Sequence, residues 1–224
     1  MMKRITYLLI GLCLLTAESK GQKKFIPELT VGGSFGTTFS KVTFIPKVQE
    51  SMLMGYTFGV TARYESEKNV GLQAELNFVQ QGWKEKFETE PQYEYSRTLN
   101  YIELPFFTHI YFGSRRVKAF LNLGPKIGYY IGEKVNSNLG DAQPEGSRPE
   151  AHQLAVANKL DWGLCGGPGI ELRTGIGYFL LEGRYYYALG DIFKSRKEDY
   201  FGKSAGQIIS VKLTYLLPIW KNNK

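Results

Sequence analysis

Strict two-residue alternation of apolar and polar side chains is the feature that most constrains how this chain can fold. Residues 178–189 show it most clearly, because Phe179, Leu181 and Tyr185 share one parity whereas Glu182 and Arg184 share the other. Successive side chains of a strand point to opposite faces, so this segment has one apolar and one charged face. The same pattern recurs along the chain and predicts eight strands. Their expected ranges are 28–36, 53–65, 70–82, 98–111, 117–131, 159–173, 177–189 and 206–219.

The predicted connections alternate strictly between short and long. The short ones are residues 66–69, 113–116 and 174–176. The long, polar ones are residues 37–52, 83–97, 132–158 and 190–205. This alternation places all short turns at one end of the molecule and all long loops at the other, as in an antiparallel up-and-down barrel. The pattern predicts one all-β domain with eight strands.

The N-terminal segment has the features of a secretory signal peptide. Lys3 and Arg4 precede the apolar run Ile5–Leu15, and small and polar residues follow as far as Gly21. The apolar run is too short for a spanning helix, which needs roughly 20 residues. We therefore expect residues 1–21 to be cleaved and residues 22–224 to form a single exported domain.

Charge and cysteine content exclude several classes of protein. The formal charge of +7 would fall to about +5 on cleavage, because three basic residues and one acidic residue lie in the leader. A surplus of this size suits contact with anionic lipid or lipopolysaccharide as well as ordinary solubility. Nothing beyond net charge favours nucleic acid. Cys165 is the one cysteine left after Cys13 is removed, which excludes a disulfide-stapled scaffold.

Periodicity alone does not decide whether the apolar faces point into or out of the barrel. A soluble lipocalin-like barrel points them inward, whereas an outer-membrane barrel points them toward lipid. The apolar faces are almost free of charge over about five or six consecutive positions, and the polar faces mix small residues with both signs of charge. Aromatic residues lie mainly near strand ends, where membrane girdles occur. They are Tyr56, Tyr64, Phe78, Trp83, Tyr101, Tyr111, Phe112, Tyr129, Trp162, Tyr185, Tyr187, Tyr215 and Trp220. These features favour the outer membrane.

With the polar faces turned inward, charges of both signs line the lumen. The predicted lumen residues are Arg63, Glu75, Glu103, Lys118, Lys126, Asp161, Glu171, Glu182, Arg184 and Lys212. An eight-stranded barrel is just wide enough for its side chains to fill, so we expect these charges to pair and plug it. In this hypothesis Glu182 pairs with Arg184, and Glu182→Ala would leave the guanidinium without its partner.

The sequence predicts no catalytic, cofactor-binding or metal-binding residues, and no cofactor. His109 lies within a predicted strand and His152 in a long loop, and neither has a nucleophile arrangement around it. Two histidines and one cysteine argue against a transition-metal cage. Residues 166–169 lack the dinucleotide fingerprint and fit a strand with small lumen residues or a bulge.

Four segments in order resemble the PorT-like outer-membrane β-barrel proteins of the Bacteroidetes. They are residues 71–83, 100–105, 124–129 and 181–189. The resemblance implies an eight-stranded transmembrane barrel with short periplasmic turns and long extracellular loops, in a family whose named member is associated with protein secretion.

The leading interpretation is therefore a non-enzymatic outer-membrane barrel that acts through its loops as a binding or assembly component. Its expected partners are outer-membrane lipid, lipopolysaccharide and other envelope proteins. Three alternatives remain open: a barrel enzyme acting on lipid or peptide, a porin-like channel for small solutes, and a soluble binder.

Overall fold

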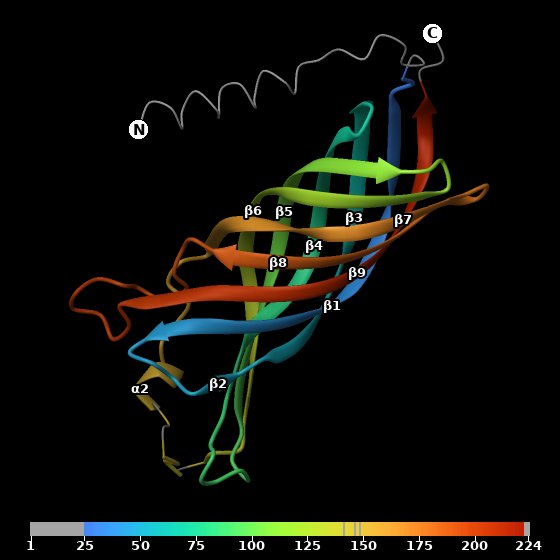
Figure 1. The fold of residues 1–224 in the computed structure, drawn as a ribbon. Helices are drawn as coiled ribbons and strands as arrows, with labels where there is room; N and C mark the ends of the chain where they lie inside the picture. Colours follow the sequence, from blue (N-terminus) through green and yellow to red (C-terminus); the bar gives the residue numbers. More distant parts are fainter. Residues whose placement is uncertain (1–24, 141, 146, 148, 222–224) are drawn as a thin grey trace, which may run out of the picture.

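The computed structural model describes residues 25–140, 142–145, 147 and 149–221 as a barrel of long antiparallel strands (Figure 1). The strands are β1 Glu28–Ile45, β3 Leu53–Glu67, β4 Val70–Glu85, β5 Tyr95–Gly113, β6 Val117–Ser137, β7 Leu160–Thr174, β8 Gly177–Ala188 and β9 Lys203–Lys221. A two-residue strand, β2 (Glu50–Ser51), and a short helix, α2 (Pro149–His152), lie in the long connections. The predicted signal peptide, residues 1–21, falls outside the described residues.

The eight long strands form a closed ring in up-and-down order. Each pairs antiparallel with its neighbours along the chain, and β1 closes the ring against β9, with Glu28 opposite Lys221. β2 adds to the far tip of β4. The short turns lie at the end where β1 begins and β9 ends, and Asn69 has a φ of 73° in one of them. Asparagine tolerates this left-handed conformation in tight turns. The predicted fold class is confirmed.

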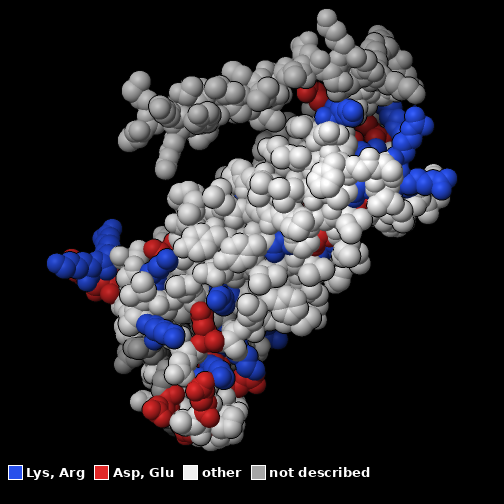
Figure 2. All heavy atoms as spheres, viewed as in Figure 1, with Lys and Arg blue, Asp and Glu red and all other residues white. Residues whose placement is uncertain are grey.

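The apolar strand faces point outward. Leu213 is 62 % exposed, whereas the lumen residue Arg63 is 1 % exposed. In Figure 2, charged side chains gather at the two ends of the molecule, and the broad band between them is almost free of charge on the face shown. Such a band matches the outer surface of a barrel that sits in lipid. Among the described residues, no helix is both long and apolar enough to cross a bilayer.

Several strands extend well beyond their predicted ranges at the long-loop end. β1 was expected to end at residue 36 but continues to Ile45, and β6 was expected to end at residue 131 but continues to Ser137. The cause is a change along β1 in the polarity of its inward-facing side chains, from polar to apolar. Val42 and Phe44 are buried, whereas Thr30, Ser34 and Thr38 are the buried residues nearer the short turns. A search for one constant apolar face therefore ends a strand such as β1 too early.

The aromatic residues do not all lie in girdles as predicted. Trp83, Tyr101 and Tyr111 are buried inside the barrel. Other members of the predicted set are exposed on the outer surface, among them Tyr56, Phe112, Tyr129, Trp162, Tyr185 and Trp220. The predicted girdles are thus incomplete, because aromatic side chains also fill the two ends of the lumen.

Candidate functional site

All ten predicted lumen residues lie on inward-facing strand positions. Eight of them are buried, and Lys118 and Asp161 are partly buried. They fall into three layers along the barrel axis, which we name the turn-end layer, the middle layer and the cap-side layer. Charges this deep need partners, because an unpaired buried charge reduces the stability of the fold by about several kcal/mol.

The turn-end layer is a network of arginines and glutamates. A guanidinium nitrogen of Arg63 lies 2.5 Å from a carboxylate oxygen of Glu171. Arg173 donates to both Glu171 and Glu65, and its Nη1 lies 3.1 Å from Glu28. Lys118 donates to Glu65 at 3.1 Å. The network therefore joins β1, β3, β6 and β7 across the lumen.

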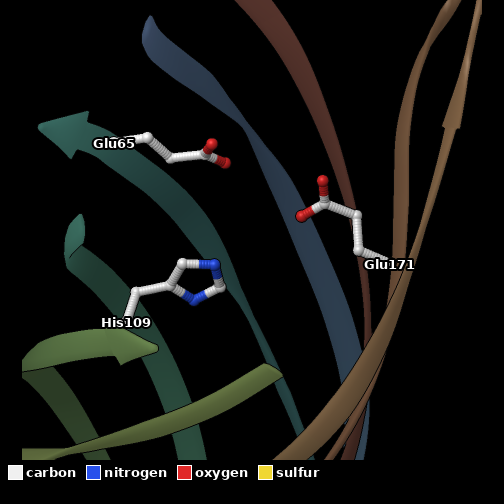
Figure 3. Close-up of side chains that lie close together, drawn as sticks. All are labelled: Glu65, His109 and Glu171. Atoms are coloured by element: carbon white, nitrogen blue, oxygen red, sulfur yellow. The ribbon is translucent and has the colours of Figure 1, made fainter. Parts of the chain in front are cut away.

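Glu65, His109 and Glu171 lie together in this layer (Figure 3). One potential ligand atom from each lies within 4.8 Å of the other two. Arg63 occupies the space between them, however, with Nη1 2.5 Å from Glu171 and 3.4 Å from Nε2 of His109. The other histidine nitrogen contacts Oδ1 of Asn122 at 2.8 Å. A cation here would have to displace Arg63, so the charges already present disfavour a metal ion.

The middle layer is centred on Arg184. Its guanidinium donates to both carboxylate oxygens of Glu75 at 2.6 and 2.7 Å, and to both oxygens of Glu182 at 2.6 and 2.8 Å. Lys212 donates to Glu75 at 2.8 Å, and Asn122 donates to Glu182 at 3.0 Å. Glu182 is thus one of two carboxylates on Arg184. The expectation that Glu182→Ala leaves the guanidinium without a partner was wrong, because Glu75 reaches it across the barrel.

The cap-side layer contains the remaining predicted charges. Lys126 donates to Glu103 at 2.5 Å, and its ammonium lies 3.3 Å from the centre of the Tyr186 ring. Asp161 accepts from Gln81 at 3.5 Å. A cavity of about 30 Å³ lies beside this layer and is lined in part by Cys165 and Lys212. A space of this size holds roughly one water molecule.

The sequence reasoning missed three charged members of the turn-end layer: Glu28, Glu65 and Arg173. A signal for two of them was present, since Glu65 continues the parity of Arg63 and Arg173 continues that of Glu171. Both are the last residues of their predicted strands, next to the short turns, where a charged side chain is equally consistent with exposure to water. Small residues also shape the lumen: a Cβ on Gly169 would lie 2.2 Å from Cζ of Phe120.

Beyond the charged layers, the long-loop end closes over an apolar core. We call this region the cap: the described residues among 41–52, 81–101, 130–159 and 189–205. Phe44 packs against Phe201 at 4.7 Å and against Trp83 at 5.2 Å between ring centres. Phe193 lies 6.0 Å from Trp83. All four side chains are buried, so the long connections form a packed unit and not separate loops.

Polar contacts tie the third long connection to the strands below it. Arg97 donates twice to Glu133, at 2.8 and 2.9 Å, and once to the carbonyl of Leu154 at 2.8 Å. His152 stacks on Tyr95 at 3.7 Å, and its Nε2 lies 2.8 Å from Glu85. Burial raises the pKa of Tyr95 to about 12, which keeps the phenol neutral. His152 therefore packs structurally in the cap, and no nucleophile contacts it among the described residues.

The combination of an apolar outer face, a charge-filled lumen and an up-and-down ring is that of an outer-membrane barrel. A family model described as outer membrane protein beta-barrel domain matches residues 20–194. The chain belongs to this family. It is therefore an outer-membrane protein, with its short turns facing the periplasm and its cap outside the cell.

Solved outer-membrane barrels are similar to the chain at low sequence identity. Ail of Yersinia pestis is 16 % identical, with 85 % of this chain and 99 % of that chain covered and a TM-score of 0.42. The Neisserial surface protein NspA is 12 % identical, with 86 % and 99 % covered and a TM-score of 0.45. OmpW of E. coli is 14 % identical, with 85 % and 97 % covered and a TM-score of 0.39. No curated protein matches the chain.

Proposed function

We propose that this protein is a non-enzymatic, plugged outer-membrane barrel whose cap is a binding or assembly surface. The observation that carries the proposal is the closed lumen. Three layers of paired charges fill it, and the cavity beside them has a volume of about 30 Å³. A barrel that offers solutes no passage leaves its extracellular end as the part available for interaction.

A pore is the alternative function that can be tested directly. Vesicles containing the purified protein should release a small sugar no faster than protein-free vesicles, and planar bilayers should show no single-channel steps. A steady conductance from the unmodified protein would contradict the plugged lumen and favour the small-solute channel.

The binding role can be tested with the connection after β6. The described residues among 140–148 contact both their own neighbours and the connection after β4: Ser147 donates its N–H to the carbonyl of Pro144, and Glu145 donates its N–H to a carboxylate oxygen of Glu90 at 3.2 Å. Deleting this segment should leave the barrel folded, as judged by its heat-dependent shift on gels. Cross-linking on intact cells should then lose a partner that the full chain retains. Unchanged cross-linking of every partner would count against a binding role for the cap.

We also propose that the cap end of the barrel binds lipopolysaccharide. Lys41 and Lys203 stand on the outward sides of β1 and β9, just beyond the apolar band. Lysines near a bilayer surface gain roughly 1 kcal/mol each from anionic head groups. The double variant Lys41→Gln with Lys203→Gln should therefore purify with less bound lipopolysaccharide than the unmodified chain. Equal amounts of bound lipopolysaccharide would show that these two lysines do not bind it.

Two further proposals come from the sequence. Residues 1–21 are a cleaved signal peptide, which the mass of the mature protein would test. The four sequence segments that resemble PorT-like proteins support a role in protein secretion by a Bacteroidetes envelope. A deletion strain that secretes normally would contradict that role.

A further inference from the structure

β6 continues beyond the end of its neighbour β7. β7 begins at Leu160, opposite Tyr129, whereas β6 runs on to Ser137. The last backbone hydrogen bond on this side runs from Tyr130 N–H to the carbonyl of Lys159, at 2.8 Å. Residues 131–137 therefore pair with β5 on one side only, in the part of the sheet that extends past the ring (Figure 1).

The direction of the free backbone groups follows from the ladder with β5. Asn138 donates its N–H to the carbonyl of Glu94 at 3.1 Å, so it faces β5. Backbone groups alternate between the two sides of an antiparallel strand. Those of Asn136 and Lys134 therefore also face β5, and those of Ser137, Val135 and Glu133 face away. The backbone groups that face away repeat about every 7 Å along the strand, and the three residues that carry them are exposed.

The other strand edges in the cap are covered. Val42 donates its N–H to a carboxylate oxygen of Glu50 at 3.0 Å, which covers β1. Gly82 donates to the hydroxyl of Ser40 at 2.8 Å, and β2 pairs with the tip of β4. Ser204 of β9 donates to Asp191 at 2.6 Å. Among the described residues of the cap, the outer edge of β6 at residues 131–137 is the one strand edge for which we find no hydrogen bond of this kind.

We propose that this edge of β6 binds an extended peptide segment of an extracellular partner protein by strand addition. The inference rests on the proposed binding role of the cap and specifies its partner chemistry. A peptide main chain supplies alternating donors and acceptors at the spacing of Glu133, Val135 and Ser137, which a lipid or glycan does not. An uncovered edge of this kind is a template for pairing with another chain.

The side chains beside the edge indicate which peptide fits. Val135 is 46 % exposed and lies on the face of the sheet that also carries Glu133. Lys134 lies on the opposite face and is exposed. Directly opposite residues in an antiparallel pair contact each other on one face. The preferred segment therefore alternates, with an apolar residue opposite Val135 and an acidic residue opposite Lys134.

A synthetic peptide tests the main-chain interaction. The probe is a fluorescent peptide of about ten residues that alternates valine and threonine, with one glutamate placed opposite Lys134. Its control has the same side chains but is N-methylated at alternate residues, which removes the donors. With the protein in nanodiscs, the probe should slow amide exchange at Glu133, Val135 and Ser137, and the control should bind about tenfold more weakly or worse. Equal binding of both peptides, or no protection of these amides at millimolar probe, would overturn the proposal.

Two variants at one position separate backbone from side chain. Val135→Pro removes an outward N–H and leaves the ladder with β5 intact, since that N–H does not face β5. Val135→Thr keeps the N–H. The proposal requires loss of probe binding in the first variant alone. A sedimentation experiment that finds dimers lost in Val135→Pro would instead assign the edge to a second copy and overturn it.

The same variants distinguish this inference from the proposed function. If deletion of residues 140–148 removes a cell-surface partner that Val135→Pro keeps, the cap binds a partner and strand addition to β6 is wrong. If neither variant changes any cell-surface cross-link while the probe still protects the edge, the edge binds peptide and the proposed role of the cap is wrong.

Discussion

The membrane-spanning part of the barrel and the cap are built from the same strands, but the inward-facing side chains are polar in the first and apolar in the second. Along β1, the inward residues Thr30, Ser34 and Thr38 give way to Val42 and Phe44. On the outward side, the apolar Phe35 is followed beyond the band by Lys41. The outer solvent explains the exchange. Where lipid covers the outside, polar groups gather within, and where water covers it, apolar groups do.

The two regions are consequently stabilised by different forces. In the lumen, the two partners of each ion pair, such as Arg184 and Glu75, compensate each other's charge where most water is excluded. In the cap, Phe44, Trp83 and Phe201 are buried against each other, and apolar area removed from water contributes the stability. Substitutions of each kind should therefore affect one region more than the other.

The largest effect is expected from Arg184→Met. The change leaves Glu75 and Glu182 facing each other without their shared cation, and a broken buried ion pair costs about 3–5 kcal/mol. Urea unfolding in detergent, followed by tryptophan fluorescence, measures the loss. Glu182→Ala should cost less, because Arg184 keeps both bonds to Glu75. Arg196→Met in the exposed connection after β8 is the matched control, and an equal loss in that control would contradict the network.

A smaller and more local effect is expected from Phe201→Ala. This residue is 1 % exposed in the cap core, and truncating a buried phenylalanine costs about 3 kcal/mol. Amide exchange should accelerate in the cap and not in the membrane-spanning strands, and the heat-dependent gel shift should persist. If the whole barrel loses protection together, the cap and the barrel are one cooperative unit and the comparison fails.

The lipid-facing surface can be tested with Leu213→Arg. Leu213 lies near the middle of β9 and points outward, where an arginine costs roughly 2–4 kcal/mol in lipid. Unfolding from lipid vesicles should report this loss. Ser195→Arg, in the exposed connection after β8, places the same charge in water and should have almost no effect. A tolerated arginine at residue 213 would argue that this face does not contact lipid.

The smallest effect is expected from the pH dependence of the cap. Burial raises the pKa of Glu50 from 4.5 to about 6, although the Val42 N–H and Lys41 favour its charged form. The folded cap thus binds the proton more tightly, and the stabilisation is complete below about pH 4.5 and is lost as pH rises through 6. Exchange of β1 amides, corrected for intrinsic rate, should show the cap opening more readily across that range. Glu50→Gln should remove the dependence.

The pattern of alternation predicted much of this architecture. The number of strands and their order followed from parity and connection length. The outward direction of residues such as Leu181 followed from the charge-free apolar faces, the mixed charges of the polar faces and the aromatic residues near strand ends. The partners in the lumen did not follow, because Arg184 meets Glu75 from a distant strand. Nor did the cap: His152 and Glu85, 67 positions apart, meet only once the strands have closed.

The sequence by itself determined that this chain forms eight amphipathic strands with one charged and one apolar face, since parity is a local property of an extended backbone. Only the tertiary structure decided how the charges pair, where the inner face changes from polar to apolar, and which edge is left open on β6. Each of these depends on the register and length of neighbouring strands, and a pattern read along one strand contains neither.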